Sequence, residues 1–174
     1  VVWATGWQPY DASQIDTLGY GKVPNVVTNM MMERLAAGNG PTGGQIQRPS
    51  DGKVPETIAF VQCAGSRDEN HLAYCSYICC MASLKQATYI LEQNPEAKVY
   101  IYYIDLRTPG RYEKFLKNIE ANENVVMIKG KVANITADPE SGDPVVVAED
   151  ILAGGLVRQR VDMVVLATGM QPST

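Results

Sequence analysis

The amino-acid sequence predicts an α/β fold in which a parallel sheet is followed by a three-stranded antiparallel meander. Strand-like apolar runs alternate with amphipathic helical patterns between residues 57 and 128. Three shorter strand-like segments, separated by turns rich in Asp, Gly and Pro, come next, and another apolar run follows them. The chain has 174 residues, of which 45% are hydrophobic and 20% charged, so it can bury a substantial core.

Charge and hydropathy exclude two kinds of partner. The net charge is −4 and no run of Lys and Arg occurs, so nothing favours contact with a nucleic-acid backbone. The longest apolar stretches, such as 99–104 and 145–148, are far shorter than the roughly 20 residues that span a bilayer. We therefore expect neither nucleic-acid binding nor direct membrane insertion.

A nine-residue pattern occurs near both ends of the chain. V-V-W-A-T-G-W-Q-P at 1–9 recurs as V-V-L-A-T-G-M-Q-P at 164–172, with seven of nine positions identical. In each copy the valines and the next residue predict a buried strand, the glycine permits a turn, and the proline ends strand pairing. Both copies run into continuing structure and no signal peptide precedes them, so we expect a fragment of a larger protein. The alternative is two similar strand–turn units that bind nothing.

Residues 10–56 are expected to form a connector with one short helix. Thr28 is a suitable N-cap for a helix over residues 29–37, and Gly38 ends that helix. The residues from there to Pro55 are rich in glycine and proline, which predicts an ordered loop rather than packed secondary structure.

The alternating pattern lies in residues 57–167. We expect a strand over 57–62, a polar loop over 63–71, a helix over 72–93, a strand over 98–105, a helix over 110–122 and a strand over 125–128. The expected meander comprises 132–137, 145–149 and 156–161, and the closing strand covers 162–167. Because crossovers between parallel strands are right-handed, helices are expected on both faces of the sheet.

A dinucleotide-binding domain would carry G-x-G-x-x-G directly after its first strand, to cradle the pyrophosphate. Only Gly65 is present there, and Asp68 and Glu69 place negative charge where phosphates would lie. Asp105, at the end of the second strand, is positioned to bind a ribose, or else to cap a helix or turn. Without the cradle, the sequence disfavours NAD(P)H binding.

The cysteines stand where that cradle is missing. Cys63, Cys75, Cys79 and Cys80 are spaced C-x11-C-x3-C-C within 18 residues. Cys75 and Cys79 are expected on one face of the predicted helix start, where the helix N-terminus favours thiolates. Four thiolates match the ligand count of a cubane iron–sulfur cluster.

Other interpretations of the four cysteines remain open at this point. A zinc site with four thiolates is the main competitor, although paired C-x2–4-C spacings at both ends are not present. Four buried structural thiols and two disulfides are further alternatives. A redox dithiol would more typically show C-x-x-C.

Several motifs around the cysteines identify a family. They are G-P-T-G-G at 40–44, R-P-S-D-G-K at 48–53, Q-C-A-G-S-R-D at 62–68, Y-C-S at 74–76 and C-C-M at 79–81. With these motifs the chain resembles the A subunit of heterodisulfide reductase. It is also similar to the related A subunit of the quinone-interacting membrane-bound oxidoreductase complex. The Ala-Thr-Gly strand ends resemble those of thioredoxin reductase-like flavoproteins.

The resemblance implies a Rossmann-like nicotinamide-domain fold, as in flavoproteins with two dinucleotide domains. Residues 1–9 would end a FAD half-domain, and residues 10–56 would be the connector. Residues 57–167 would form the inserted domain with the cysteine cluster, and residues 168–174 would return toward the FAD domain.

The resemblance also implies cofactors, partners and a function. The cysteines would ligate a [4Fe–4S] cluster, and electrons would pass between it and FAD within an oxidoreductase subunit of anaerobic metabolism. FAD would lie against Thr5, Gly6, Thr168 and Gly169 in the full-length subunit; the isolated fragment, without a Gly-rich FAD motif, is expected to be inactive. The partners would be other subunits of a heterodisulfide reductase-like or quinone-linked complex, in the cytoplasm or peripheral to a membrane.

The competing function is an NAD(P)H-binding domain of a pyridine nucleotide-disulfide reductase-like enzyme, with a structural zinc or free cysteines. Three further residues have two interpretations each. Arg67 and Lys85 are candidates for neutralising cluster charge, or for facing solvent. His71, the only histidine, is a candidate hydrogen-bond partner of a sulfur, or a solvated loop residue.

Overall fold

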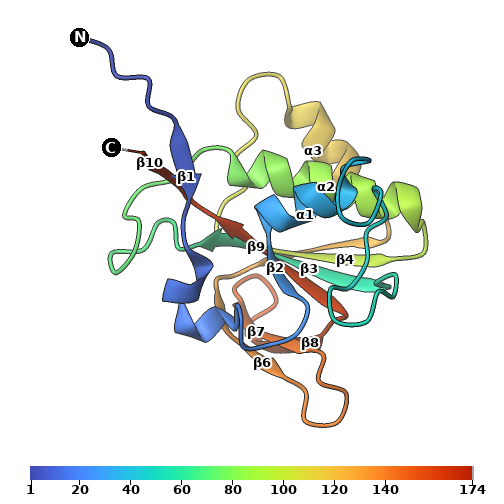
Figure 1. Ribbon diagram of the computed structural model, residues 1–174. Coiled ribbons are helices and arrows are strands. Elements are labelled where there is room, and N and C mark those ends of the chain that lie inside the picture. The colour runs from blue at the N-terminus through green and yellow to red at the C-terminus, as the bar shows by residue number, and fades with distance from the viewer. Residues whose placement is uncertain (174) are drawn as a thin grey trace.

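A parallel sheet forms the centre of the computed structural model, which describes residues 1–173 (Figure 1). Among these residues the sheet has five strands in the order β2-β9-β3-β4-β5, and each pairs in parallel with its neighbours. Their bounds are β2 Val26–Thr28, β9 Met163–Thr168, β3 Thr57–Ala64, β4 Lys98–Tyr103 and β5 Val125–Lys129. The α/β class with a parallel sheet and a separate meander is therefore confirmed.

The helices cover one face of this sheet (Figure 1). They are α1 Asn29–Ala36, α2 Cys79–Gln93 and α3 Glu113–Glu120. Leu84 and Ile90 of α2 are buried in one cluster with Phe60 of β3 and Val165 of β9, because alternate residues of a strand point to the same face. The expected N-cap is confirmed, since the Thr28 hydroxyl accepts a hydrogen bond from the Met31 N–H at 3.3 Å.

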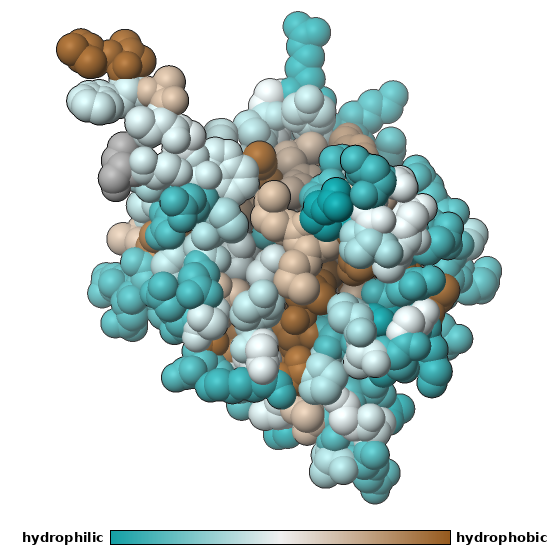
Figure 2. Space-filling view, in the orientation of Figure 1, coloured by the Kyte–Doolittle hydropathy of each residue, from teal (hydrophilic) through white to brown (hydrophobic). Residues whose placement is uncertain are grey.

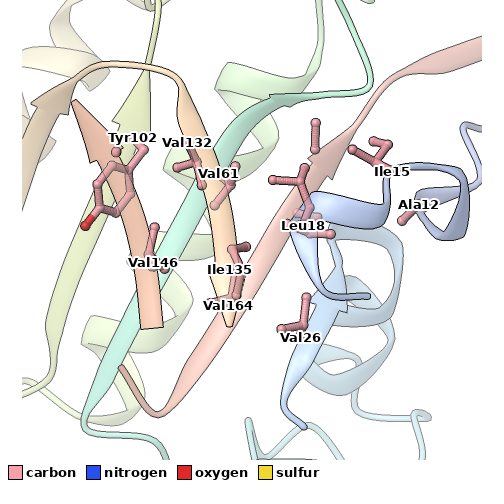
Figure 3. Close-up of a cluster of buried hydrophobic side chains, with 14 of the residues drawn as sticks. Ala12, Ile15, Leu18, Val26, Val61, Tyr102, Val132, Ile135, Val146 and Val164 are labelled. Carbon is pink, nitrogen blue, oxygen red and sulfur yellow. The ribbon is translucent and has the colours of Figure 1, made fainter. Parts of the chain in front are cut away.

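The opposite face is covered by the meander, so the expectation of helices on both faces was wrong. The meander strands are β6 Val132–Ala137, β7 Pro144–Asp150 and β8 Gly155–Arg160. Two short 3-10 helices, η1 Ala12–Gln14 and η2 Asp16–Leu18, lie beside it. In the core on this side, Val61 and Val164 of the sheet pack with Ile135, Val146 and Leu18 (Figure 3). The buried residues of β6 and β7, Val132, Ile135, Val146 and Ala148, supply the cover that a helix would otherwise give.

The segment expected as a connector contributes to the sheet. Its residues Val26–Thr28 form β2, which pairs with β9 at the sheet edge, and α1 follows directly. A strand of three residues is too short to show a period in the sequence, so it was not predicted. No helix among residues 1–173 has the length and apolar content needed to cross a membrane.

The two copies of the nine-residue pattern lie side by side. Their last three residues, β1 Trp7–Pro9 and β10 Met170–Pro172, pair in antiparallel register with Gln8 opposite Gln171 (Figure 1). Each strand ends at its proline, Pro9 in β1 and Pro172 in β10, as the sequence predicted. Thr174, the last residue of the 168–174 segment, lies outside the described residues.

Only the second copy forms the expected buried strand. Val164 and Val165 are fully buried in β9, whereas Val1, Val2 and Trp3 are exposed. The expectation of a buried strand at residues 1–3 was wrong, because within residues 1–173 no strand pairs with them. Identical side chains therefore give a strand only where a neighbouring strand is available.

Candidate functional site

The cysteines gather at the carboxyl edge of the parallel sheet. Cys63 lies at the end of β3, Cys75 in the loop 65–78, and Cys79 and Cys80 begin α2. All four are free thiols; Cys75 is half-buried and the other three are buried. The carboxyl edge of such a sheet is where α/β proteins bind their ligands.

The helix that carries two of the cysteines begins later than predicted. It was expected from Leu72 but begins at Cys79, so Cys75 is a loop residue and does not share a helical face with Cys79. The preceding loop folds back on itself: the Leu72 N–H donates to the Gly65 carbonyl at 2.9 Å. Tyr77 then adopts a φ of 64°, which no α-helix accommodates. A helix was expected to begin at Leu72, but backbone hydrogen bonds within the loop give residues 72–78 another conformation.

The backbone at Cys63 is unusual. Its φ is 56°, in the left-handed region, and the register between β3 and β9 shifts between Val61 and Ala64. A non-glycine residue in a sparsely populated region costs about 1–3 kcal/mol, and such residues cluster at functional sites. A bulge of this kind redirects a side chain next to the end of a strand.

Backbone groups from two strand ends and from the cysteine loop contact the sulfurs. The Cys79 Sγ donates to the Thr168 carbonyl at 3.4 Å, at the end of β9. The Cys80 Sγ donates to the Asp105 carbonyl at 3.6 Å, just after β4. The Cys75 Sγ accepts from the Tyr77 N–H at 3.4 Å. With Cys63 on β3, the ends of β3, β4 and β9 thus converge on one group of thiols.

Burial keeps these thiols protonated in the absence of a cation. Burial, and then the neighbouring thiols, raise the pKa of Cys79 to about 12. Burial also raises the pKa of Cys63 and of Cys80. Cys79 and Cys80 begin α2, and their burial opposes the thiolate form that a helix N-terminus favours. The three buried sulfurs can be thiolates together only if positive charge joins them.

The donor set consists of four cysteine sulfurs, a number that suits either a zinc ion or a [4Fe–4S] cluster. A zinc ion binds each thiolate at about 2.3 Å, which brings the sulfurs to within about 4 Å of one another. Among residues 1–173, no group of three or more His, Cys, Asp or Glu side chains is arranged to hold one metal ion. A [4Fe–4S] cluster is held by four cysteine thiolates, one to each iron, and so accepts sulfurs that lie farther apart.

Side chains from other elements hold the cysteine loop. Arg67 Nη1 lies 2.9 Å from Asp105 Oδ2, and Lys131 Nζ lies 2.7 Å from Asp68 Oδ2. The Tyr10 hydroxyl lies 2.7 Å from His71 Nδ1. His71 is therefore half-buried against Tyr10, which agrees with neither interpretation of it from the sequence.

The second Ala-Thr-Gly motif touches the cysteine loop and the first does not. Thr168 is buried, and its hydroxyl donates to Asn29 Oδ1 at 3.1 Å. A Cβ at Gly169 would lie 2.2 Å from the Ser66 hydroxyl, so only glycine fits beneath the loop. Thr5 and Gly6 are exposed, and nothing lies within 4 Å of a Cβ placed on Gly6.

An apolar cavity of about 810 Å³ lies beside the cysteines. It is bounded by the β1/β10 ribbon, α1, α3 and the start of α2, and Figure 2 shows hydrophobic residues gathered in the centre of this face. Lys85 lines the cavity and pairs with Glu33 at 3.5 Å, which places it away from the cysteines. Sequence reasoning missed this cavity, because its lining comes from separate elements, namely Trp7, Pro9, Asn29, Met30, Tyr77, Ile78, Met81, Tyr112, Phe115, Thr168 and Met170 among others.

Known proteins are similar to this chain in sequence. An iron–sulfur A subunit of CoB–CoM heterodisulfide reductase from Methanopyrus kandleri is 42% identical over 99% of the chain. The corresponding protein from Methanocaldococcus jannaschii is 41% identical over 99%. The chain is related to the heterodisulfide reductase A subunits along essentially its whole length. It spans about a quarter (26%) of the length of these relatives, and no family model matches it.

Solved structures confirm the fold expected from the resemblance. The chain is similar to thioredoxin reductase from Lactococcus lactis, with a TM-score of 0.55 and 14% identity, over 96% of this chain and 43% of that one. Thioredoxin reductase from Giardia duodenalis gives a TM-score of 0.54 and 13% identity, over 97% and 43%. The relationship to the heterodisulfide reductases thus rests on sequence, and the thioredoxin reductase likeness on fold alone.

Proposed function

We propose that this chain is an electron-transfer region of a FAD and iron–sulfur oxidoreductase subunit, of the kind found as the A subunit of heterodisulfide reductase. Cys63, Cys75, Cys79 and Cys80 would hold a [4Fe–4S] cluster that exchanges electrons with the flavin. One observation carries the proposal: four free thiols, three of them buried, gather at the carboxyl edge of the sheet, where α/β proteins bind ligands. The cluster would supply one-electron chemistry at that edge.

The apolar cavity supports a flavin beside the cysteines. Its lining includes Tyr77 and Ile78, which lie between Cys75 and Cys79 in the chain. It also includes Thr168, whose carbonyl contacts the Cys79 thiol. A concave, mostly apolar site with a few polar groups suits a planar aromatic ring system. Thr168 and Gly169 are therefore the proposed flavin-side residues of this region, while Thr5 and Gly6 would meet FAD through parts of a longer polypeptide.

The Tyr10 ring occupies the space beside Gly65 that a dinucleotide phosphate would need. Gly65, the sole glycine available for a cradle after β3, packs against Tyr10: a Cβ there would lie 2.6 Å from Tyr10 Cδ1. The loop beyond Gly65 covers Gly169, since a Cβ on Gly169 would lie 2.2 Å from the Ser66 hydroxyl. This favours the cluster over the NAD(P)H-binding alternative.

At the scale of the whole protein, the proposal includes other subunits of a heterodisulfide reductase-like or quinone-linked complex as partners. It also includes a cytoplasmic location, free or peripheral to a membrane. The inserted-domain boundaries at 57 and 167 belong to the same proposal, and the side-by-side β1 and β10 support it, because chain entry and exit then lie together.

Anaerobic reconstitution of the full chain with iron and sulfide tests the cluster. We expect about four irons and four sulfides per chain, with broad visible absorbance that bleaches on reduction. Replacement of all four cysteines by serine should abolish both. The matched control replaces Ser50, an exposed residue far from the cysteines in sequence, by alanine and should keep the iron.

Other outcomes decide between the alternatives. Stoichiometric zinc without iron in protein prepared anaerobically would refute the cluster. Saturable binding of NADH or NADPH in calorimetry would support the nicotinamide-binding function instead.

A further inference from the structure

Arg67 is held in a fixed position within the cysteine loop. Its φ is 55°, its N–H donates to the Tyr74 carbonyl at 3.1 Å, and its guanidinium lies 2.9 Å from the Asp105 carboxylate. The side chain is only 26% exposed. A left-handed arginine persists only where its surroundings impose that conformation. The loop therefore directs this guanidinium to one place.

That place is beside the cysteines. The guanidinium binds the carboxylate of Asp105, the residue whose backbone carbonyl accepts a hydrogen bond from the Cys80 thiol. The Arg67 N–H binds the carbonyl of Tyr74, the residue before Cys75, and Arg67 follows Cys63 by four residues. One cation is thus tied to residues that adjoin or contact Cys75 and Cys80.

Asp105 connects the same cation to the sheet. Its carboxylate holds Arg67, while its backbone carbonyl accepts from the Cys80 thiol. From the sequence, Asp105 was expected to bind a ribose or to cap a helix or turn. Its carboxylate instead forms an ion pair with Arg67. The other candidate for balancing charge, Lys85, pairs with Glu33 in the cavity.

We propose that Arg67 is the built-in counter-charge of the cluster and that Asp105 positions it. This inference rests on the proposed function. Reduction adds one electron, donated by the flavin, to the cluster and forms or breaks no protein bond. The negative charge at the four cysteines thereby rises by one unit, and a nearby cation stabilises the reduced form more than the oxidised one. Arg67 therefore makes the cluster easier to reduce.

Anaerobic redox titration of the reconstituted full chain, followed by electron paramagnetic resonance, tests the proposal. At the midpoint of the unsubstituted protein, we expect Arg67→Gln to lower the ratio of reduced to oxidised cluster about tenfold. For a one-electron couple this equals a midpoint lower by about 59 mV. Arg67→Lys keeps a positive charge and should restore most of the ratio. Asp105→Asn keeps a hydrogen-bond acceptor for Arg67 but removes the opposing charge, so it should raise the ratio.

A control separates charge from loop anchoring. Lys131→Gln breaks the ion pair to Asp68 in the same loop and should leave the midpoint unchanged. An unchanged midpoint in Arg67→Gln protein with full iron content would overturn the inference and leave the proposed function standing. If Arg67→Gln protein fails to retain iron, Asp105→Asn decides by the sign of its shift. If the unsubstituted chain binds no iron, the proposed function fails and the inference fails with it.

Discussion

Polar side chains cluster at the amino ends of the parallel strands, here called the amino edge, and at their carboxyl ends, the carboxyl edge. The two clusters differ in kind. At the amino edge, the Asp162 carboxylate accepts hydrogen bonds from the Glu56 and Thr57 N–H groups and the Thr57 hydroxyl, all within 2.9 Å. Arg48 joins it and also binds Asp51 and Asp143. At the carboxyl edge, burial raises the pKa of Cys63, Cys79 and Cys80. The amino-edge cluster is thus joined by ion pairs and hydrogen bonds between its own side chains, whereas the thiols are free and mostly buried.

The largest expected effect breaks the amino edge. Asp162→Ala removes three hydrogen bonds and an ion pair, and we expect a loss of about 3 kcal/mol in the free energy of unfolding. Urea denaturation measures it, and iron content of the folded protein should not change. Asp16→Ala, at the exposed pair with Lys22, is the matched control and should leave the free energy of unfolding nearly unchanged. Loss of iron binding in folded Asp162→Ala protein would contradict the separation of the two edges.

A second substitution acts on the carboxyl edge. The new Cβ in Gly169→Ala must displace the loop at Ser66 and Ser76, so we expect about 1–3 kcal/mol of destabilisation together with reduced iron incorporation. Gly38→Ala is the control, because nothing lies within 4 Å of a Cβ there. Thermal unfolding and iron analysis check both. Full iron content in Gly169→Ala would show that the loop does not need this contact.

The pH dependence should distinguish the edges as well. The folded-state pKa of Cys79, about 12, lies above its ordinary value of 9.0. Its neutral form therefore contributes stability that is present below pH 9 and is lost between pH 9 and 12. In the metal-free chain we expect the free energy of unfolding to fall by up to about 1.4 kcal/mol per pH unit in this window. Denaturation at pH 8 and pH 10 measures it, and Cys79→Ser should flatten the dependence; an equal slope in both would refute the assignment.

The smallest expected effect concerns the anchoring of the loop. Tyr10→Phe removes the hydrogen bond between the Tyr10 hydroxyl and His71 but keeps the ring against Gly65. We expect about 1 kcal/mol of destabilisation and faster amide hydrogen exchange in residues 65–78. Tyr20→Phe, whose hydroxyl contacts only Met31 Sδ at 3.5 Å, is the control and should leave exchange in this loop unchanged.

The sequence predicted the strands well, because their periodicity is local. The bounds of β6, 132–137, agree with the expectation; β5 differs from it by one residue at one end, and β9 by one residue at each end. The start of α2 was misplaced by seven residues, since the apolar spacing of 72–78 says nothing of the bonds from Gly65 and Tyr74 that hold a loop. Contacts between residues apart in the sequence therefore determine where α2 begins.

The site shows the same division between local and distant information. The cysteine spacing placed four thiols within one short segment, and their convergence on β3, β4 and β9 followed from the topology. The cavity and the pairing of Arg67 with Asp105 join residues far apart in sequence, so no pattern in the chain could indicate them. The first copy of the repeat was misjudged because burial depends on a neighbour that a motif does not specify.

The ribbon of β1 and β10 has a mechanical consequence. Trp7 lies opposite Pro172, so a pull applied through Gly6 and Ser173 loads the ribbon at one end and opens it pair by pair, as in unzipping. The last bond to open joins the Tyr10 N–H to the Gly169 carbonyl at 2.7 Å, directly beside the cysteine loop. A load from outside is thus dissipated in three residue pairs before it reaches the sulfurs.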